Sequence, residues 1–102
     1  ALPICFANQV QALLELGCGA VIVKQNAQGS SYFDLNLQVE QPADLIEPEE
    51  FIATTGAGDC FNGGFLAGIL SGERPEKALQ MGNAAARRLI TSPHGILDLI
   101  PF

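Results

Sequence analysis

The sequence predicts an α/β domain in which helices flank a small sheet. A compact β-branched run occupies 20–25, and a segment with period-two alternation occupies 33–39. Two helical patterns follow at 57–71 and 75–90. Alternation of helical and strand patterns favours layered α/β packing, and 102 residues have room for one domain. We therefore expect residues 1–102 to form a single unit.

Composition and charge limit the classes of function. Hydrophobic residues make up 48% and charged residues 16% of the chain, which is typical of a folded domain. A net charge of −6 with five Lys and Arg argues against a nucleic-acid surface. No apolar run reaches the roughly 18 residues that a membrane span requires. The three cysteines have no metal-ligand spacing, so we expect no metal site, no disulfide framework and a cytoplasmic location.

The first half of the chain reads as a helix, a strand and a hairpin. Asn8 is the expected N-cap of a short amphipathic helix that stops at Gly17. The run at 20–25 shows little alternation, which predicts a strand buried on both faces of a parallel sheet. The alternation at 33–39 predicts a strand or hairpin with one solvent-facing side.

The second half begins with an acidic loop and ends with two helices. Residues 40–50 carry two prolines and five acidic residues, so we expect an exposed loop, followed by a short strand at Phe51 and Ile52. The helix at 57–71 is expected to end at Gly72, and Pro75 to open the next one. Three glycines inside the first helix each cost about 1 kcal/mol relative to alanine. Something must therefore approach the helix closely at these positions, which are Gly63, Gly64 and Gly68.

The stretch "TTGAGDCFNGGF" at 54–65 carries the chemistry. Small residues at the start of a helix let the backbone N–H groups of Ala57, Gly58 and Asp59 converge on an anion. Asp59 falls in the first helical turn, within reach of a ligand at the helix tip. A carboxylate base beside a phosphate-binding nest predicts phosphoryl transfer to a hydroxyl.

Other interpretations of this stretch were weighed. A dinucleotide fingerprint requires glycine where Phe61 stands, and a P-loop requires lysine where Gly64 stands. The G-x-G-D string of intramembrane aspartyl proteases requires transmembrane helices that the chain lacks. A purely structural alternative makes Gly56 the N-cap and Asp59 part of a capping-box-like arrangement. Spacing alone leaves the structural and the catalytic alternatives open.

With a strand, this motif and a following Asn- and Ala-rich helix in that order, the sequence resembles the ribokinase-like, PfkB-type carbohydrate kinases. The family pattern D-T-x-G-A-G-D-x-F is matched closely within 54–65, and the match is looser but collinear over 20–33 and 78–95. The resemblance implies a three-layer α/β/α fold with a mostly parallel sheet. Of that fold, this chain resembles the C-terminal segment, without the N-terminal sugar-binding part and its lid.

The resemblance also assigns roles to individual residues. Asp59 corresponds to the catalytic base, and the amides of Gly56, Ala57 and Gly58, with that of Asp59, correspond to the anion hole. Nucleotide-side positions are Lys24, Asn26, Gly29 and Asn83, of which Asn83 has the structural alternative of a polar residue on a helix surface. Ala53 stands where the family has an aspartate of a monovalent-cation site, so the sequence does not predict potassium activation.

The resulting expectation is ATP-dependent phosphorylation of a sugar or sugar-like hydroxyl, with Mg²⁺ brought by ATP. The partners are then small molecules, namely the sugar and ATP, together with the remainder of the kinase chain. The isolated segment is expected to be a weak or inactive catalyst. The alternative is a non-catalytic remnant that acts as a structural module, in which an exposed sheet edge favours self-association.

Overall fold

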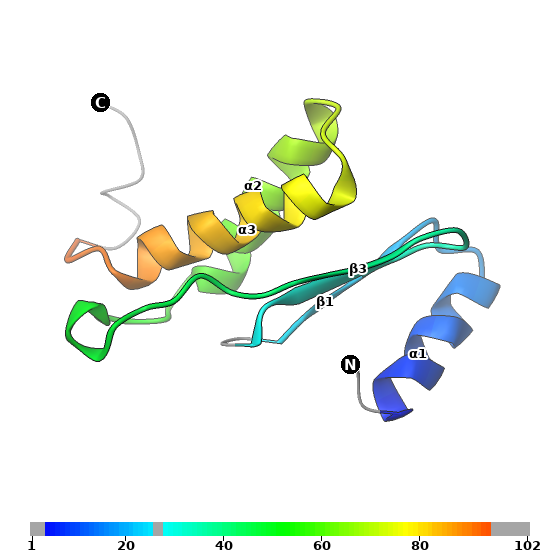
Figure 1. Ribbon diagram of the computed structural model, residues 1–102, viewed down its shortest axis with the longest axis horizontal. Coiled ribbons are helices and arrows are strands. Elements are labelled where there is room, and N and C mark those ends of the chain that lie inside the picture. Colours follow the sequence, from blue (N-terminus) through cyan, green and yellow to red (C-terminus); the bar gives the residue numbers. More distant parts are fainter. Residues whose placement is uncertain (1–3, 26–27, 95–102) are drawn as a thin grey trace.

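The computed structural model describes residues 4–25 and 28–94, with side chains from Ala7 onward. Three strands lie between α1 on one side and the α2–α3 pair on the other, so three layers are present (Figure 1). The elements in chain order are α1 (Ile4–Glu15), β1 (Val21–Lys24), β2 (Ser30–Phe33), β3 (Gln38–Gln41), the 3₁₀ turn η2 (Pro48–Glu50), α2 (Ala57–Leu70) and α3 (Pro75–Ile90).

The described strands form one sheet in the order β1-β2-β3, and both pairings are antiparallel. The strand expected at 20–25 is therefore present, but the parallel pairing expected of it is wrong. Short connections between consecutive strands permit the antiparallel arrangement, whereas parallel neighbours need a long crossover. Ile22, Tyr32 and Val39 are cross-strand neighbours, and this row packs against the core that α2 and α3 form.

A tight turn makes the alternating segment a hairpin, which confirms one of the two predicted alternatives. The Asp34 N–H donates to the Leu37 carbonyl at 2.9 Å, and the Asp34 carboxylate accepts from the Asn36 N–H and the Tyr32 hydroxyl, both at 2.8 Å. The expected wet face is present on β3, whose residues alternate between exposed and half-buried. Leu35 departs from the alternation because it lies in the turn, where it is 78% exposed. The Asn36 amide, followed by the Tyr32 hydroxyl, lowers the pKa of Asp34.

The core lies where α2 crosses α3. Phe61 and Phe65 stack with ring centroids 6.3 Å apart and pack on Ala78 and Leu79, which are fully buried. Glycine lets the helices approach: a Cβ on Gly64 would lie 2.5 Å from the Met81 carbonyl oxygen. The other two close positions are Gly68, against Ala78, and Gly82, against Phe61. The predicted close approach is confirmed at Gly64 and Gly68, while no described atom lies within 4 Å of a Cβ at Gly63.

The ends of the helices α2 and α3 follow the sequence signals. Gly72 has a left-handed φ of 83°, and the Glu73 N–H donates to the Gly68 carbonyl at 3.0 Å, which closes the end of α2. Pro75 begins α3, as predicted.

Two predicted boundaries are wrong. α1 begins at Ile4, so Asn8 lies inside the helix and is not its N-cap, although Gly17 does end it. Residues 51 and 52 do not form a strand among the described residues. The amides of Ile52 and Ala53 both donate to the carbonyl of Ile90, at 2.9 and 3.3 Å, which is an anchor to the end of α3 rather than a ladder.

Candidate active site

The tip of α2 is built on a glycine turn. Gly56 is the N-cap with φ of 87°, in the left-handed region that glycine adopts without strain. The Ala57 N–H donates to the Thr54 carbonyl at 3.0 Å, so this amide, predicted as an anion-hole donor, is used by the turn instead. The helical hydrogen bonds begin with the Cys60 N–H, which donates to the Gly56 carbonyl. The amides of Gly58 and Asp59 precede this bond and have no acceptor within the helix.

Asp59 lines a cleft of about 640 Å³. Its side chain is exposed, and within residues 4–25 and 28–94 it has no hydrogen-bond or ion-pair partner. No side-chain cap forms at this end of α2, so the capping-box alternative is not what the structure contains. One wall of the cleft comes from the segment that leads into α2. The other comes from Leu89 near the end of α3 and from Ser92 and Pro93, which follow α3.

Lys24, at the end of β1, brings a positive charge to the same helix turn. Its Nζ donates to Asn62 Oδ1 at 3.1 Å and lies 5.9 Å from the centroid of the Phe61 ring. A Cβ placed on Gly58 would be 3.5 Å from this Nζ. An ammonium group and the positive end of the α2 dipole therefore lie side by side, which favours a bound anion.

Gly29 and Asn83 form a second, buried group. Gly29 is buried with φ of 104° and packs against the segment at 41–43. Asn83 is 8% exposed and bonds the side chain of Ser30. The interpretation of Asn83 as a surface residue of the helix is therefore wrong, and its predicted nucleotide contact stays a prediction. Asn26, the fourth nucleotide-side residue predicted, lies outside the described residues.

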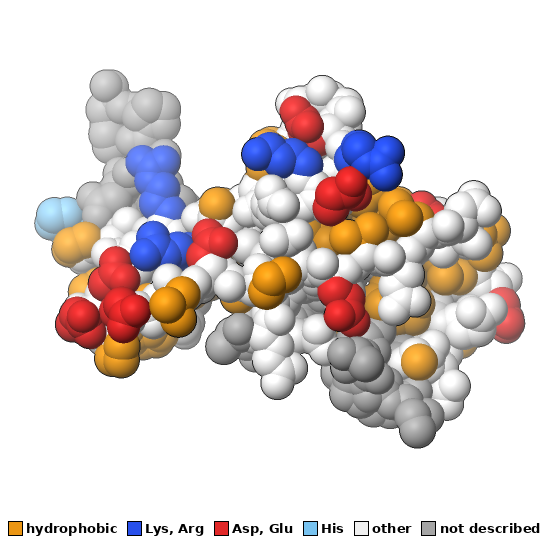
Figure 2. Space-filling view, viewed as in Figure 1, with side chains coloured by type: hydrophobic (Ala, Val, Ile, Leu, Met, Phe, Trp, Pro, Cys, Tyr) orange, Lys and Arg blue, Asp and Glu red, His pale blue; other side chains and the backbone are white. Residues whose placement is uncertain are grey.

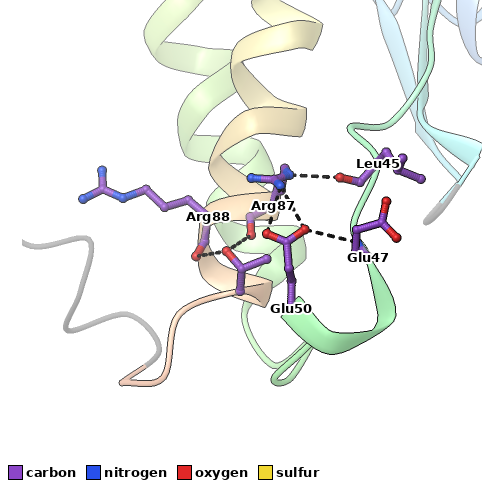
Figure 3. Close-up of polar contacts among 6 residues, drawn as sticks. Leu45, Glu47, Glu50, Arg87 and Arg88 are labelled. Atoms are coloured by element: carbon purple, nitrogen blue, oxygen red, sulfur yellow. Dashed lines mark hydrogen bonds and ion pairs between the residues drawn. The ribbon is translucent and has the colours of Figure 1, made fainter.

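The loop that leads to the cleft is fixed to α3 by Arg87. Figure 3 shows its guanidinium between the Leu45 carbonyl and the Glu50 carboxylate. Nε donates to the Leu45 oxygen at 3.2 Å, and Nη2 lies 3.4 Å from Glu50 Oε2. Acidic side chains gather at this end of the molecule (Figure 2), where η2 and its cap carry Glu47, Glu49 and Glu50. Sequence reasoning did not predict these contacts of Arg87, or those of Ser30 and Asn62, because no motif marks them.

Comparison with known proteins decides the family. Residues 6–101 match the pfkB family of carbohydrate kinases. The chain belongs to this family. A cytidine kinase of Thermococcus kodakarensis is 36% identical over 74 residues, which cover 72% of this chain and 26% of that protein.

Two solved pfkB-like structures carry ligands. Arabidopsis thaliana ribokinase complexed with ribose and ATP is 28% identical, with a TM-score of 0.79, over 89% of this chain and 29% of that one. An E. coli protein described as a ribokinase II, in complex with ATP and Mg²⁺, is 35% identical, with a TM-score of 0.78, over 84% and 27%. These similarities confirm the ribokinase-like α/β fold class. The chain spans 26% of the length of that cytidine kinase and 22% of a curated ribokinase of Arabidopsis thaliana.

The described residues of this pfkB segment offer no cluster for a metal ion. Within the described side chains, 7–25 and 28–94, no three His, Cys, Asp or Glu side chains gather where they could hold one. Asp59 is the carboxylate at the helix tip, and a single carboxylate fits Mg²⁺ held mainly by substrate phosphates. None of the helices in the described part of the chain is long and apolar enough to cross a membrane.

Proposed function

We propose that the protein carrying this segment transfers the γ-phosphoryl group of ATP to a hydroxyl of a sugar or sugar-like acceptor, with Asp59 as the general base. The observation that carries the proposal is the exposed Asp59 carboxylate, which has no partner among the described residues. It lies at the helix tip together with Lys24 and with the amides of Gly58 and Asp59, which have no acceptor within the helix. Membership of the pfkB family supplies the reaction class.

Each group has a defined part in the proposed reaction. Asp59 accepts the proton of the acceptor hydroxyl as the acceptor oxygen bonds to phosphorus, and the bond to the β,γ-bridging oxygen breaks to release ADP. The amides of Gly58 and Asp59, with the Lys24 ammonium, donate to the oxygens of the transferred group, where negative charge accumulates. Mg²⁺ bound with ATP neutralises part of the triphosphate charge.

The acceptor in this proposal is a hydroxyl of a sugar or nucleoside. The relatives include a cytidine kinase and a ribokinase solved with ribose, which indicates a hydroxyl on a sugar or nucleoside. Gly29 and Lys24 form the nucleotide side in this proposal. We further propose that the 102-residue segment alone is weak or inactive, because it spans under a third of most curated relatives. A cytoplasmic location stays a prediction from cysteine usage.

Exposed apolar side chains support a role for the rest of the kinase as partner. Leu66 and Leu70 on α2 are 55% and 86% exposed, and among the described strands β1 has one unpaired edge. Such surfaces favour either docking of the remaining chain or self-association of the isolated segment. Sedimentation of the isolated segment distinguishes a monomer from a self-associating module.

The test of the proposed function is Asp59→Asn in the full-length protein, assayed for ATP-dependent phosphorylation of a panel of sugars and nucleosides. Loss of the general base is expected to lower kcat by about a hundredfold or more. Asp44→Asn is the matched control, because Asp44 is an exposed aspartate in the loop before η2. Wild-type turnover in Asp59→Asn would refute the assignment of the base.

A further inference from the structure

Asn83 forms the centre of a buried polar network between α3 and the sheet. Its Oδ1 accepts from the Ser30 hydroxyl at 3.1 Å, and its Nδ2 donates to the carbonyls of Gln41 at 3.4 Å and Pro42 at 3.0 Å. Ser30 is 2% exposed and Asn83 is 8% exposed. Both contacts of the amide nitrogen are therefore to main-chain oxygens, and the protein itself bonds both ends of the side-chain amide.

The network touches both groups of the nucleotide side. Ser30 is the cross-strand partner of Lys24 on one side and of Gln41 on the other. Asn83 thus bonds the Ser30 hydroxyl and the Gln41 carbonyl, which belong to paired residues of β2 and β3. These bonds hold the end of the sheet at which β1 ends with Lys24. Removal of the amide would leave buried polar atoms of this end unsatisfied, which is costly.

Gly29 is held by the same carbonyl segment. A Cβ on Gly29 would overlap the Gln41 carbonyl oxygen and would lie 2.8 Å from both the Ala43 nitrogen and Pro42 Cα. The Gly29 carbonyl in turn accepts from the Gln25 N–H at 2.8 Å, which closes the turn. The backbone at 41–43 therefore packs directly against Gly29, and the hydrogen bonds of Asn83 connect this backbone to α3.

We propose that Asn83 is a positioning residue: it orients Lys24 and Gly29 through Ser30 and the carbonyls of Gln41 and Pro42. Burial of an amide bonded at both ends in this position fixes one arrangement of the strand ends. The kinetic part of the proposal rests on the proposed function, whereas the structural part does not.

The experiment uses the full-length protein with Asn83→Ala, Ser30→Ala and the double variant. Hydrogen exchange of the Gln25 amide is expected to accelerate about tenfold in Asn83→Ala and about threefold in Ser30→Ala. Exchange of the Cys60 amide in α2 is expected to stay unchanged. The KM for ATP should rise by similar factors and kcat should fall, because Lys24 also donates to the transferred group in the proposed function, while the KM for the acceptor stays within twofold. The double variant should match Asn83→Ala, because both changes break one network.

Two results would overturn the inference. One is a Gln25 amide that exchanges at the wild-type rate in both single variants. The other is a Ser30→Ala protein with the wild-type KM for ATP beside an Asn83→Ala protein with a raised one, since that pattern indicates direct nucleotide contact by Asn83. If Asn83→Ala does not fold, the two readouts of Ser30→Ala decide the question alone. Wild-type protein without ATP-dependent activity refutes the proposed function, and hydrogen exchange still decides the positioning role.

Discussion

The two sides of α2 use glycine for opposite purposes. Toward α3, a side chain on Gly64 or Gly68 would meet the backbone of the neighbouring helix within 3 Å. Toward solvent, Gly63 has no described atom within 4 Å, and at Gly58 only the end of Lys24 comes near. Glycine on the first side lets two helices touch, and on the second it leaves space beside Asp59. One glycine-rich motif therefore satisfies a packing requirement and an access requirement independently.

The largest effect on stability is expected at a glycine that has no room for a side chain. In Gly64→Ala the new methyl group meets the Met81 carbonyl at 2.5 Å, and neither backbone can yield without separating the helices. Overpacking of this kind lowers the free energy of unfolding by about 1–3 kcal/mol. Urea denaturation of wild type and variant measures the difference.

Gly63→Ala is the matched control for that change. It adds the same methyl group one residue away, where the described structure is open, and it should raise helix stability by up to about 1 kcal/mol. Equal losses of stability in both variants would contradict the distinction between the two sides of α2.

A smaller effect is expected at the loop that borders the cleft. Arg87→Ala removes the contacts to Leu45 and Glu50, but the paired side chains are 35% and 41% exposed, so the cost in stability is about 1 kcal/mol or less. The Ile52 amide, which this loop presents to α3, should exchange with solvent up to about fivefold faster. Lys77→Ala on the exposed face of α3 serves as the control. A Lys77 variant with the same faster exchange would show that Arg87 has no specific role.

The smallest effect is expected in the pH dependence of stability. It arises in the hairpin of β2 and β3, far from α2 in sequence. Hydrogen bonds from Asn36 and Tyr32 lower the pKa of Asp34 in the folded state. A lowered folded pKa contributes stability above the unfolded value, about 3.9, and this contribution is lost as pH falls through the folded pKa. Thermal unfolding between pH 5 and pH 2, read against Asp34→Asn, should show a steeper acid loss in wild type. Parallel curves would contradict this assignment.

The sequence predicts those features that depend on local signals. Hydrophobic periodicity, Gly72 and Pro75 place the ends of α2 and α3, since each signal acts on its own segment of backbone. Asn8 misleads because asparagine caps helices but also fits inside one when apolar residues precede it. The alternation around Leu35 continues through a turn, and period alone does not reveal where a strand reverses.

The site is predictable in its motif and less so in its surroundings. Asp59 and the helix tip follow from glycine and carboxylate spacing. The use of the Ala57 amide by Thr54 depends on the turn geometry before the helix, which no residue pattern encodes. The burial of Asn83 depends on where β3 crosses α3, and a polar residue within a helix gives no signal for such a partner. Contacts between residues far apart in the sequence therefore determine these features, and local sequence patterns do not reveal them.

The central claim is that the backbone at the tip of α2 binds the transferred phosphoryl group. Amide chemical shifts of the full-length protein, titrated with a non-hydrolysable ATP analogue in the presence of Mg²⁺, test it most directly. We expect the Gly58 and Asp59 amides to shift most, and the Ala57 amide to shift less because it already donates to Thr54. Saturation with the analogue while the Gly58 and Asp59 signals stay in place would contradict the account.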